Sequence, residues 1–249
     1  MKNPYSKLNT LKKINPTGLG ESSDGEMPEY LKKNPGHKIL NVGSGNPTLI
    51  DNRIVHMDIF RYKVIDLIAD ASHLPFVDRS FDAIFCEAVL EHVKNPFQVV
   101  GEFSRVLKEE GYVSVGVPFL FPYHDVPDHY FNISSSGIKI LFKDYQPIQT
   151  GVYLGPWYAL RNIIGNYKKM LKRVYRDQQV GFLERIRIFF IYRLLSWGMK
   201  FNHQTIALTE EEQNVLAGAV YFKGKKVLLS QPPSNLKILK NEESKKDNS

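Results

Sequence analysis

The chain has 249 residues, 43% of them hydrophobic, and its 33 Lys and Arg exceed its 26 Asp and Glu by seven charges. This ordinary globular composition excludes collagen-like, coiled-coil and wholly disordered chains, and the length suits one large domain or a domain with an appendage. Cys86 is the only cysteine, so no disulfide can form within the chain. A single cysteine fits a reducing compartment, and we expect a cytoplasmic protein in which Cys86 belongs to the core.

The two ends of the chain differ in composition from the middle. Residues 1–25 are polar, lack the apolar segment of a secretory signal, and are expected to form a flexible N-terminal segment. Residues 241–249 contain no apolar side chain and are expected to be a disordered tail. One folded domain is therefore predicted over residues 26–240. The longest apolar stretch, 186–201, is interrupted by arginines and is too short for a transmembrane helix.

Short apolar runs rich in β-branched residues predict six strands. They are residues 39–42, 53–58, 64–69, 81–86, 112–117 and 215–222. Continuous apolar runs of this length are typical of strands that are covered on both faces, as in a mostly parallel sheet.

Four helices are predicted between and after these strands. Asn95 can cap the first, Pro96 suits its first position, and Gly111 would lie just past its end. Its apolar residues recur at helical spacing: Phe97, Val100, Phe103 and Leu107. A second helix is expected after Ser134, with three side chains facing inward: Ile138, Leu141 and Phe142. The last two helices are predicted over residues 157–170 and 182–197. Strands that alternate with helices indicate an α/β fold.

Glycine and acidic residues follow the first three predicted strands. Gly43-Ser44-Gly45 ends the first strand, Asp58 ends the second and Asp70 ends the third. Ligands of open parallel sheets bind outside the carboxyl ends of the strands, where glycine lets the backbone approach closely. Asp58 could accept hydrogen bonds from both hydroxyls of a ribose, and Asp70 could accept one from the exocyclic amine of adenine. The ordered set predicts an adenosine pocket.

Four segments resemble class I S-adenosylmethionine-dependent methyltransferases, in particular the type 11 subgroup. Residues 41–45 (NVGSG) resemble the first motif, and residues 70–82 (DASHLPFVDRSFD) resemble the most specific stretch of the subgroup. Residues 87–93 (EAVLEHV) and 105–108 (RVLK) resemble the next two segments. The resemblance covers residues 37–150. It implies a Rossmann-like, mostly parallel seven-stranded sheet, S-adenosyl-L-methionine as the cofactor and methyl transfer as the activity.

The resemblance also implies which residues bind the cofactor. Residues 43–45 would line its methionine and ribose side, Asp58 would bind the ribose, Asp70 and Ala71 the adenine, and Glu87 would lie beside the methionine end. The full expected set is Asn41, Gly43, Ser44, Gly45, Asp58, Asp70, Ala71 and Glu87. No metal ligands are predicted.

Three positions depart from the subgroup. Pro47 stands where many members carry glycine, and residues 109–111 (EEG) replace the usual Pro-Gly-Gly. Residues 44–53 between the first two strands are too few for a crossover helix, so a loop or single turn is expected. The same shortness argues against a nicotinamide-dependent dehydrogenase. Such an enzyme needs a third glycine where Thr48 stands and a helix facing the pyrophosphate.

The acceptor is expected near residues 119–134, which follow the fifth strand. A hydroxyl acceptor needs a general base, a role that suits histidine. His124 and His129 are the candidate catalytic bases, and a structural role for either one remains the alternative. Asn132 stands where the subgroup has arginine. His92 precedes a helix cap, and we expect it to be structural.

Residues 161–200 contain ten basic and two acidic residues, whereas the rest of the chain has a net charge of −1. We expect residues 156–205 to form a helical insertion that covers or shapes the acceptor pocket. Three interpretations remain open: a lid packed on the sheet, a helix at a membrane surface through residues 182–200, or a clamp for a phosphorylated acceptor. No nucleic-acid-binding module is recognisable, so nucleic acid is not expected as a partner.

The function expected from these features is methyl transfer from S-adenosylmethionine to a small or lipid-linked acceptor. The favoured acceptor atom is an oxygen of a sugar or polysaccharide precursor. The alternative is a non-catalytic S-adenosylmethionine-binding protein that serves regulation or assembly.

Overall fold

A computed structural model describes residues 23–124, 128–177, 181–205 and 208–227. The tail predicted over residues 241–249 lies outside this range, as does most of the N-terminal segment. Residues 23–25 of that segment begin helix α1 (Ser23–Lys33).

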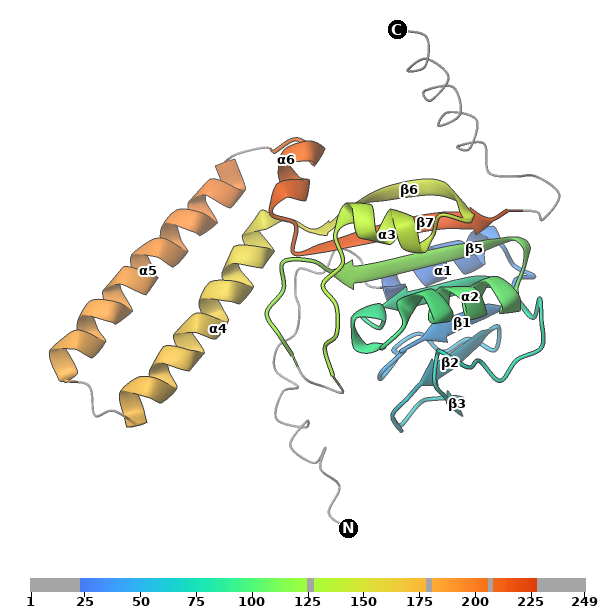
Figure 1. The fold of residues 1–249 in the computed structure, drawn as a ribbon, viewed down its shortest axis with the longest axis horizontal. Coiled ribbons are helices and arrows are strands. Elements are labelled where there is room, and N and C mark those ends of the chain that lie inside the picture. Colours follow the sequence, from blue (N-terminus) through green and yellow to red (C-terminus); the bar gives the residue numbers. More distant parts are fainter. Residues whose placement is uncertain (1–22, 125–127, 178–180, 206–207, 228–249) are drawn as a thin grey trace, which may run out of the picture.

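Seven strands form one sheet in the order β3-β2-β1-β4-β5-β7-β6 (Figure 1). Their bounds are β1 (Ile39–Val42), β2 (Ile54–Asp58), β3 (Leu67–Ile68), β4 (Phe81–Glu87), β5 (Leu107–Pro118), β6 (Tyr145–Leu154) and β7 (Ala219–Lys226). The first five strands pair in parallel, and β7 pairs antiparallel with both β5 and β6. This confirms the predicted mostly parallel, Rossmann-like sheet.

Several expected boundaries differ from the structure; strand β3, for example, covers only residues 67–68 of the predicted 64–69. Helix α2 (Pro96–Val106) ends before Leu107, so Leu107 and Gly111 belong to β5 and not to the helix end. Strand β7 begins four residues later than predicted, because a capping box between Thr209 and Glu212 starts helix α6 (Glu210–Val215). Strand β6 was not predicted. It lies at the edge of the sheet, is largely exposed and contains Pro147, so its sequence lacks a clear apolar pattern.

Helices cover both faces of the sheet. On one face, α2 and α3 (Ser135–Leu141) pack on side chains that include Leu40, Ile84 and Val115. On the other face, Met27 and Leu31 of α1 pack on a set made up of Ile39, Ile54, Ala83 and Phe85. Cys86 is fully buried, as expected, and so are most of the predicted inward-facing residues. Phe97 is the exception, with 57% of its surface exposed.

The predicted helix caps are present. The Asn95 side chain accepts a hydrogen bond from the backbone of Gln98, and Ser134 accepts one from Gly137. The connection from β1 to β2 contains no helix, as its length predicted.

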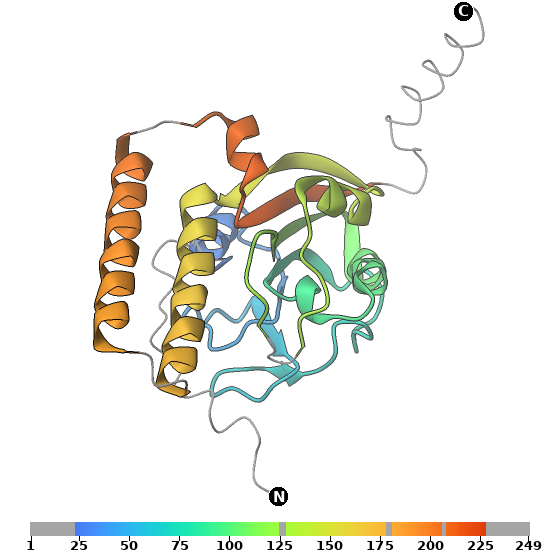
Figure 2. The same cartoon turned by 60° about the vertical axis from the view of Figure 1, so that its left-hand side comes forward.

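Helices α4 (Pro156–Asp177) and α5 (Phe182–Thr205) form a hairpin that stands off the sheet on the side where the parallel strands end (Figures 1 and 2). Helix α5 packs along α4, which contacts β6 and α6. The apolar side chains of α5 are not buried on the sheet: Phe182 is 75% and Trp197 69% exposed. The structure therefore differs from the expected packed lid. Among the described helices, none has the length and apolarity needed to cross a membrane.

Candidate active site

A cavity of about 290 Å³ lies at the carboxyl ends of the first four strands. Its size is near the lower end of the roughly 300–1,000 Å³ typical of small-molecule pockets. Four short segments supply its wall: Val42, Gly43 and Gly45; Met57 to Phe60 with Tyr62; Ala69 to Ala71; and Ala88, Val89, His92 and Val93. These lining residues all precede α4, so the helical hairpin contributes none of them.

Residues 43 and 45, in the loop after β1, require glycine for different physical reasons. Gly43 has a φ of +68°, and a Cβ there would lie 2.1 Å from Cγ2 of Val89. Gly45 has a φ of +57°, whereas no atom lies within 4 Å of a Cβ placed on it. Packing and backbone conformation thus both require glycine at residue 43, and conformation alone requires it at residue 45. The open side of Gly45 allows a ligand to approach the main chain.

The carboxylate of Asp58 links the two loops that form the cavity wall. It is 8% exposed, and its Oδ2 accepts a hydrogen bond from the Gly45 N–H at 2.9 Å. Its Oδ1 accepts one from the Phe60 N–H, also at 2.9 Å. A carboxylate oxygen has two lone pairs, so both oxygens can still accept a ribose hydroxyl.

Asp70 follows β3 and lines the same cavity. The backbone N–H and the hydroxyl of Ser72 both donate to its Oδ1, at 2.8 and 2.7 Å, and these bonds lower the pKa of the carboxyl group. Asp70 therefore remains an anionic acceptor at neutral pH, as recognition of an amine requires.

Two aromatic residues that were not predicted complete this part of the wall. Phe60 and Tyr62 follow Asp58 in the loop after β2 and line the cavity. Burial, together with the negative charge of Asp58, raises the pKa of Tyr62, so its phenol remains a hydrogen-bond donor. The alternation of aromatic residues directly after the acidic residue was the available sequence signal.

Three of the eight predicted cofactor residues do not line the cavity. Asn41 is buried within the sheet, where its Nδ2 lies 3.2 Å from Nδ1 of His56. Glu87 accepts a hydrogen bond of 3.2 Å from the Tyr153 hydroxyl of β6. Ser44 is absent from the lining although both neighbours belong to it, and its buried hydroxyl has no partner among the described residues.

The far end of the cavity wall contains a histidine that the sequence suggested to be structural. His92 ends the short 3-10 helix η2 (Leu90–His92), and it lines the cavity. Its Nδ1 lies 2.5 Å from the Asp128 carbonyl oxygen, which can only accept, so Nδ1 carries the proton and Nε2 the lone pair. Burial lowers the pKa of His92 and favours this neutral form.

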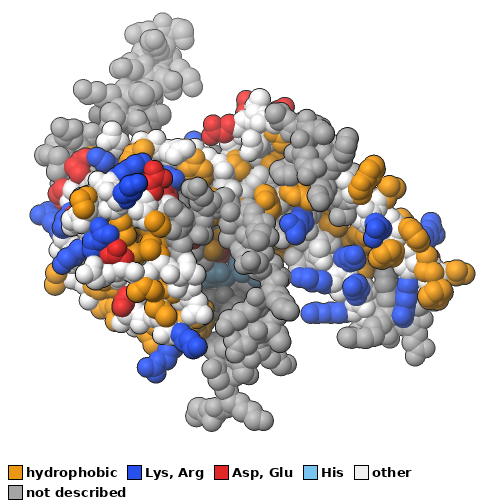
Figure 3. Space-filling view, turned by 180° about the vertical axis from the view of Figure 1, so that it is seen from behind, with side chains coloured by type: hydrophobic (Ala, Val, Ile, Leu, Met, Phe, Trp, Pro, Cys, Tyr) orange, Lys and Arg blue, Asp and Glu red, His pale blue; other side chains and the backbone are white. Residues whose placement is uncertain are grey.

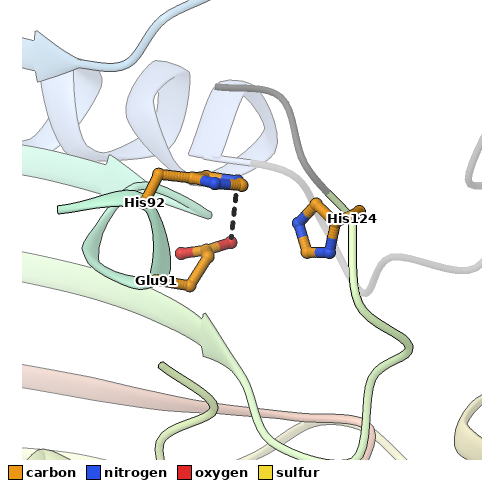
Figure 4. Close-up of side chains that lie close together, drawn as sticks. All are labelled: Glu91, His92 and His124. Atoms are coloured by element: carbon orange, nitrogen blue, oxygen red, sulfur yellow. Dashed lines mark ion pairs between the residues drawn. The ribbon is translucent and has the colours of Figure 1, made fainter. Parts of the chain in front are cut away.

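Glu91 lies beside His92 and is almost completely buried. Its side chain is 1% exposed, and its Oε1 lies 3.8 Å from Nε2 of His92 (Figure 4). Its other oxygen, Oε2, has no hydrogen-bond partner among the described residues. Burial raises the pKa of Glu91 to about 8. The local sequence around residue 91 does not predict a buried acid.

The two candidate bases have different surroundings. His129 accepts a hydrogen bond of 3.3 Å from the His124 backbone N–H through Nδ1. Its Nε2 lies 3.0 Å from both the Phe131 carbonyl oxygen and Oδ1 of Asn132. Both ring nitrogens of His129 therefore take part in hydrogen bonds within the loop, whereas its role as a base stays a prediction. The ring of His124 instead packs edge-on against His92, with 4.8 Å between the centroids.

These features fit an adenosine-containing cofactor without a pyrophosphate. The glycine loop offers main chain, and Asp58 and Asp70 offer acceptors in one cavity. No helix begins between β1 and β2, so the helix N-terminus that binds a dinucleotide pyrophosphate is lacking at that loop.

Comparisons with known proteins agree with this geometry. A family model described as a methyltransferase domain, of type 11, matches residues 28–115. An uncharacterized protein of Methanocaldococcus jannaschii is 36% identical over 74 residues, which are 27% of this chain and 32% of that protein. The methyltransferase GfsG of Streptomyces halstedii is 28% identical over 119 residues, or 39% of this chain and 43% of that protein. The chain thus matches less than half the length of these curated relatives.

A chain from the complex between the Haloferax volcanii Trm112 methyltransferase activator and a methyltransferase has the same fold. It aligns with a TM-score of 0.51 and 13% identity, over 92% of this chain and 98% of that chain. Residues 28–115 therefore match a type 11 methyltransferase domain, from a family whose cofactor is S-adenosylmethionine, and the chain shares the fold of the chain from that complex.

Proposed function

We propose that the protein transfers the methyl group of S-adenosylmethionine to a hydroxyl oxygen of a small or lipid-linked acceptor, namely a sugar or polysaccharide precursor. The observation that carries this proposal is the single cavity that collects Gly43, Gly45, Asp58 and Asp70 at one end and His92 at the other. The first four suit the nucleoside, and the histidine end is where the acceptor would approach.

The reaction is a displacement in which the acceptor oxygen forms a bond to the methyl carbon. The carbon–sulfur bond breaks, the sulfur keeps its electron pair, and S-adenosylhomocysteine leaves. The protein contributes mainly by holding oxygen, carbon and sulfur in line. The hydroxyl proton has to leave the acceptor, and the polar groups beside His92 are the candidates to accept it.

The helical hairpin supports a lipid-linked acceptor and contact with a membrane surface from the cytoplasmic side. Exposed apolar residues of α5, such as Phe182, Phe190 and Leu194, alternate with basic residues, and Figure 3 shows both kinds side by side over the hairpin. A cavity of about 260 Å³ between α4 and α5 is lined by Lys168, Leu171, Lys172, Arg185, Ile188, Phe189 and Tyr192. Cationic and apolar side chains in one cavity suit a phosphate headgroup attached to a chain.

The test combines binding with transfer. Titration calorimetry with S-adenosylmethionine should give saturable binding, and S-adenosylmethionine labelled in the methyl group should label a lipid or glycolipid fraction of a cell extract. Base-stable label in an ether linkage would support transfer to oxygen. Failure to bind the cofactor would contradict the proposal. Binding with no labelled product in any fraction would favour the non-catalytic alternative.

A further inference from the structure

We propose that Glu91, His92 and His124 bind a divalent first-row transition-metal ion, such as Zn²⁺, at the edge of the cofactor cavity. One potential ligand atom from each of the three side chains lies within 4.8 Å of the other two (Figure 4). Two of the residues belong to η2 after β4, and His124 comes from the loop after β5, so the fold and not the sequence brings them together.

The hydrogen bonds of both histidines favour metal binding. His92 donates from Nδ1 to the carbonyl oxygen of Asp128 at 2.5 Å, and His124 donates from Nδ1 to that of Pro122 at 3.1 Å. In each ring, Nε2 is then the nitrogen with the lone pair. Metal-binding histidines are oriented in this way, because a carbonyl bonded to one nitrogen fixes the tautomer and directs the other toward the ion.

Glu91 supplies the second, independent observation. Its carboxyl group is almost completely buried, and Oε2 has no hydrogen-bond partner in the described part of the chain. An unpartnered buried oxygen is costly, since its lost hydration is not replaced. A cation bound to Oε1, the carboxylate oxygen that faces His92, would offset part of this cost by pairing with the charge that the two oxygens share.

The distances require only small movements. Ligand atoms around an ion with bonds of about 2.0–2.2 Å lie roughly 3–3.5 Å apart. Oε1 of Glu91 and Nε2 of His92 are 3.8 Å apart, and all three ligand atoms lie within 4.8 Å of one another, so side-chain movements of about 1–1.5 Å would complete the site. Two imidazoles and one carboxylate are a ligand set for zinc, iron or cobalt and leave further positions open.

The open coordination positions suggest a catalytic role for the ion, and this role rests on the proposed methyl transfer. His92 belongs to the cavity wall, so the ion would lie where the acceptor approaches. A hydroxyl bound to a divalent cation loses its proton to solvent water more readily. The resulting alkoxide oxygen can form a bond to the methyl carbon, while the carbon–sulfur bond breaks and the sulfur leaves with the bonding pair.

The decisive experiment measures metal binding by itself. Tag-free full-length protein, stripped with a chelator, is titrated with ZnCl₂ in a calorimeter, and bound zinc is counted after dialysis. We expect one ion per chain. His124→Ala and Glu91→Gln should each weaken binding tenfold or more, while the exposed control His73→Ala should bind as the wild type does. Thermal melts establish whether each variant is folded. If Glu91→Gln does not fold, His124→Ala alone tests the site, because His124 lies in a half-buried loop.

Stoichiometry well below one, or equal affinity in His124→Ala and wild type, would overturn the metal site. Titration of the metal-free protein with S-adenosylmethionine separates the two proposals. The metal-free protein should still bind S-adenosylmethionine. If neither the metal-free nor the metal-loaded protein binds it, the proposed function is contradicted, but the metal site is not. If labelling occurs, its insensitivity to chelation would overturn the catalytic role of the ion.

Discussion

Gly43 and Val89 meet at the tightest point of the cofactor loop. A Cβ at residue 43 would lie 2.1 Å from Cγ2 of Val89, in a backbone conformation that costs L-residues about 1–2 kcal/mol. We expect Gly43→Ala to lower the melting temperature and the affinity for S-adenosylmethionine more than Gly45→Ala does, since residue 45 has space. Adding Val89→Ala should recover the part of the loss that comes from the clash. If Gly43→Ala and Gly45→Ala have equal effects and Val89→Ala restores nothing, backbone strain at positive φ alone accounts for the loss of stability and affinity.

Asp58 combines a structural and a binding role in one carboxylate. Its removal would free the Gly45 and Phe60 N–H groups and take away the expected ribose acceptor. We expect Asp58→Ala to weaken S-adenosylmethionine binding at least tenfold, because a hydrogen bond to a charged group contributes about 1.5–3 kcal/mol and 1.4 kcal/mol is a factor of ten. Calorimetry measures the change, with Asp144→Ala as the exposed control. Unchanged affinity would count against the placement of the ribose.

Helix α1 is attached to the sheet by one acidic side chain as well as by its apolar face. Glu26 accepts hydrogen bonds from the Tyr112 hydroxyl at 2.6 Å and the Ser114 hydroxyl at 3.0 Å, and it pairs with Lys223 at 3.1 Å. Burial, followed by the bond to Glu26, raises the pKa of Tyr112, which therefore remains a donor. One residue of α1 thus joins β5 and β7.

Glu26→Ala should therefore destabilise the fold, by about 1–3 kcal/mol, since two hydroxyls and an ammonium group lose their partner. Urea unfolding followed by circular dichroism measures the difference. Glu29→Ala on the same helix is the matched control. Glu29 forms an exposed ion pair with Lys33 at 2.8 Å, so its replacement should leave the midpoint unchanged. Equal midpoints for both variants would show that α1 is held by Met27 and Leu31 alone.

The positive charge of the molecule is concentrated in the helical hairpin, whereas the sheet domain is nearly neutral. The net charge of residues 161–200 is +8, and apolar side chains of the same helices, such as Phe182 and Trp197, are exposed. A surface that is both basic and apolar matches anionic lipid, where each basic residue contributes about 1 kcal/mol.

Reversing two of these charges gives a direct test. Arg185→Glu with Arg193→Glu should weaken binding to phosphatidylglycerol vesicles at least tenfold in sedimentation assays at low salt. Lys139→Glu with Lys143→Glu makes the same change in net charge on exposed residues near α3 and should have little effect. A similar loss in both double variants would indicate attraction by overall charge, and no vesicle binding by the wild type would contradict membrane contact.

The sequence by itself determined the strands at residues 39–42, 54–58 and 81–86, the caps Asn95 and Ser134, and the acids at the ends of β2 and β3. These depend on neighbouring residues, because apolar runs, glycine turns and capping side chains act over a few positions. Helix α1 was missed for the same reason: it contains Pro28 and only a few apolar residues, and its stability comes from the sheet it covers.

Only the tertiary structure decided which residues share a cavity. Asn41 bonds to His56 of the adjacent strand, and Glu87 bonds to Tyr153 of β6, so neither lines the cavity. His92 does line it, and the Glu91 carbonyl next to it accepts bonds from the Tyr130 and Phe131 N–H groups at 2.7 and 3.3 Å. Such contacts join residues that are 15 to 66 positions apart in the sequence, and no local pattern encodes them. The hairpin is similar, since an apolar helical pattern does not say whether protein or another surface will cover it.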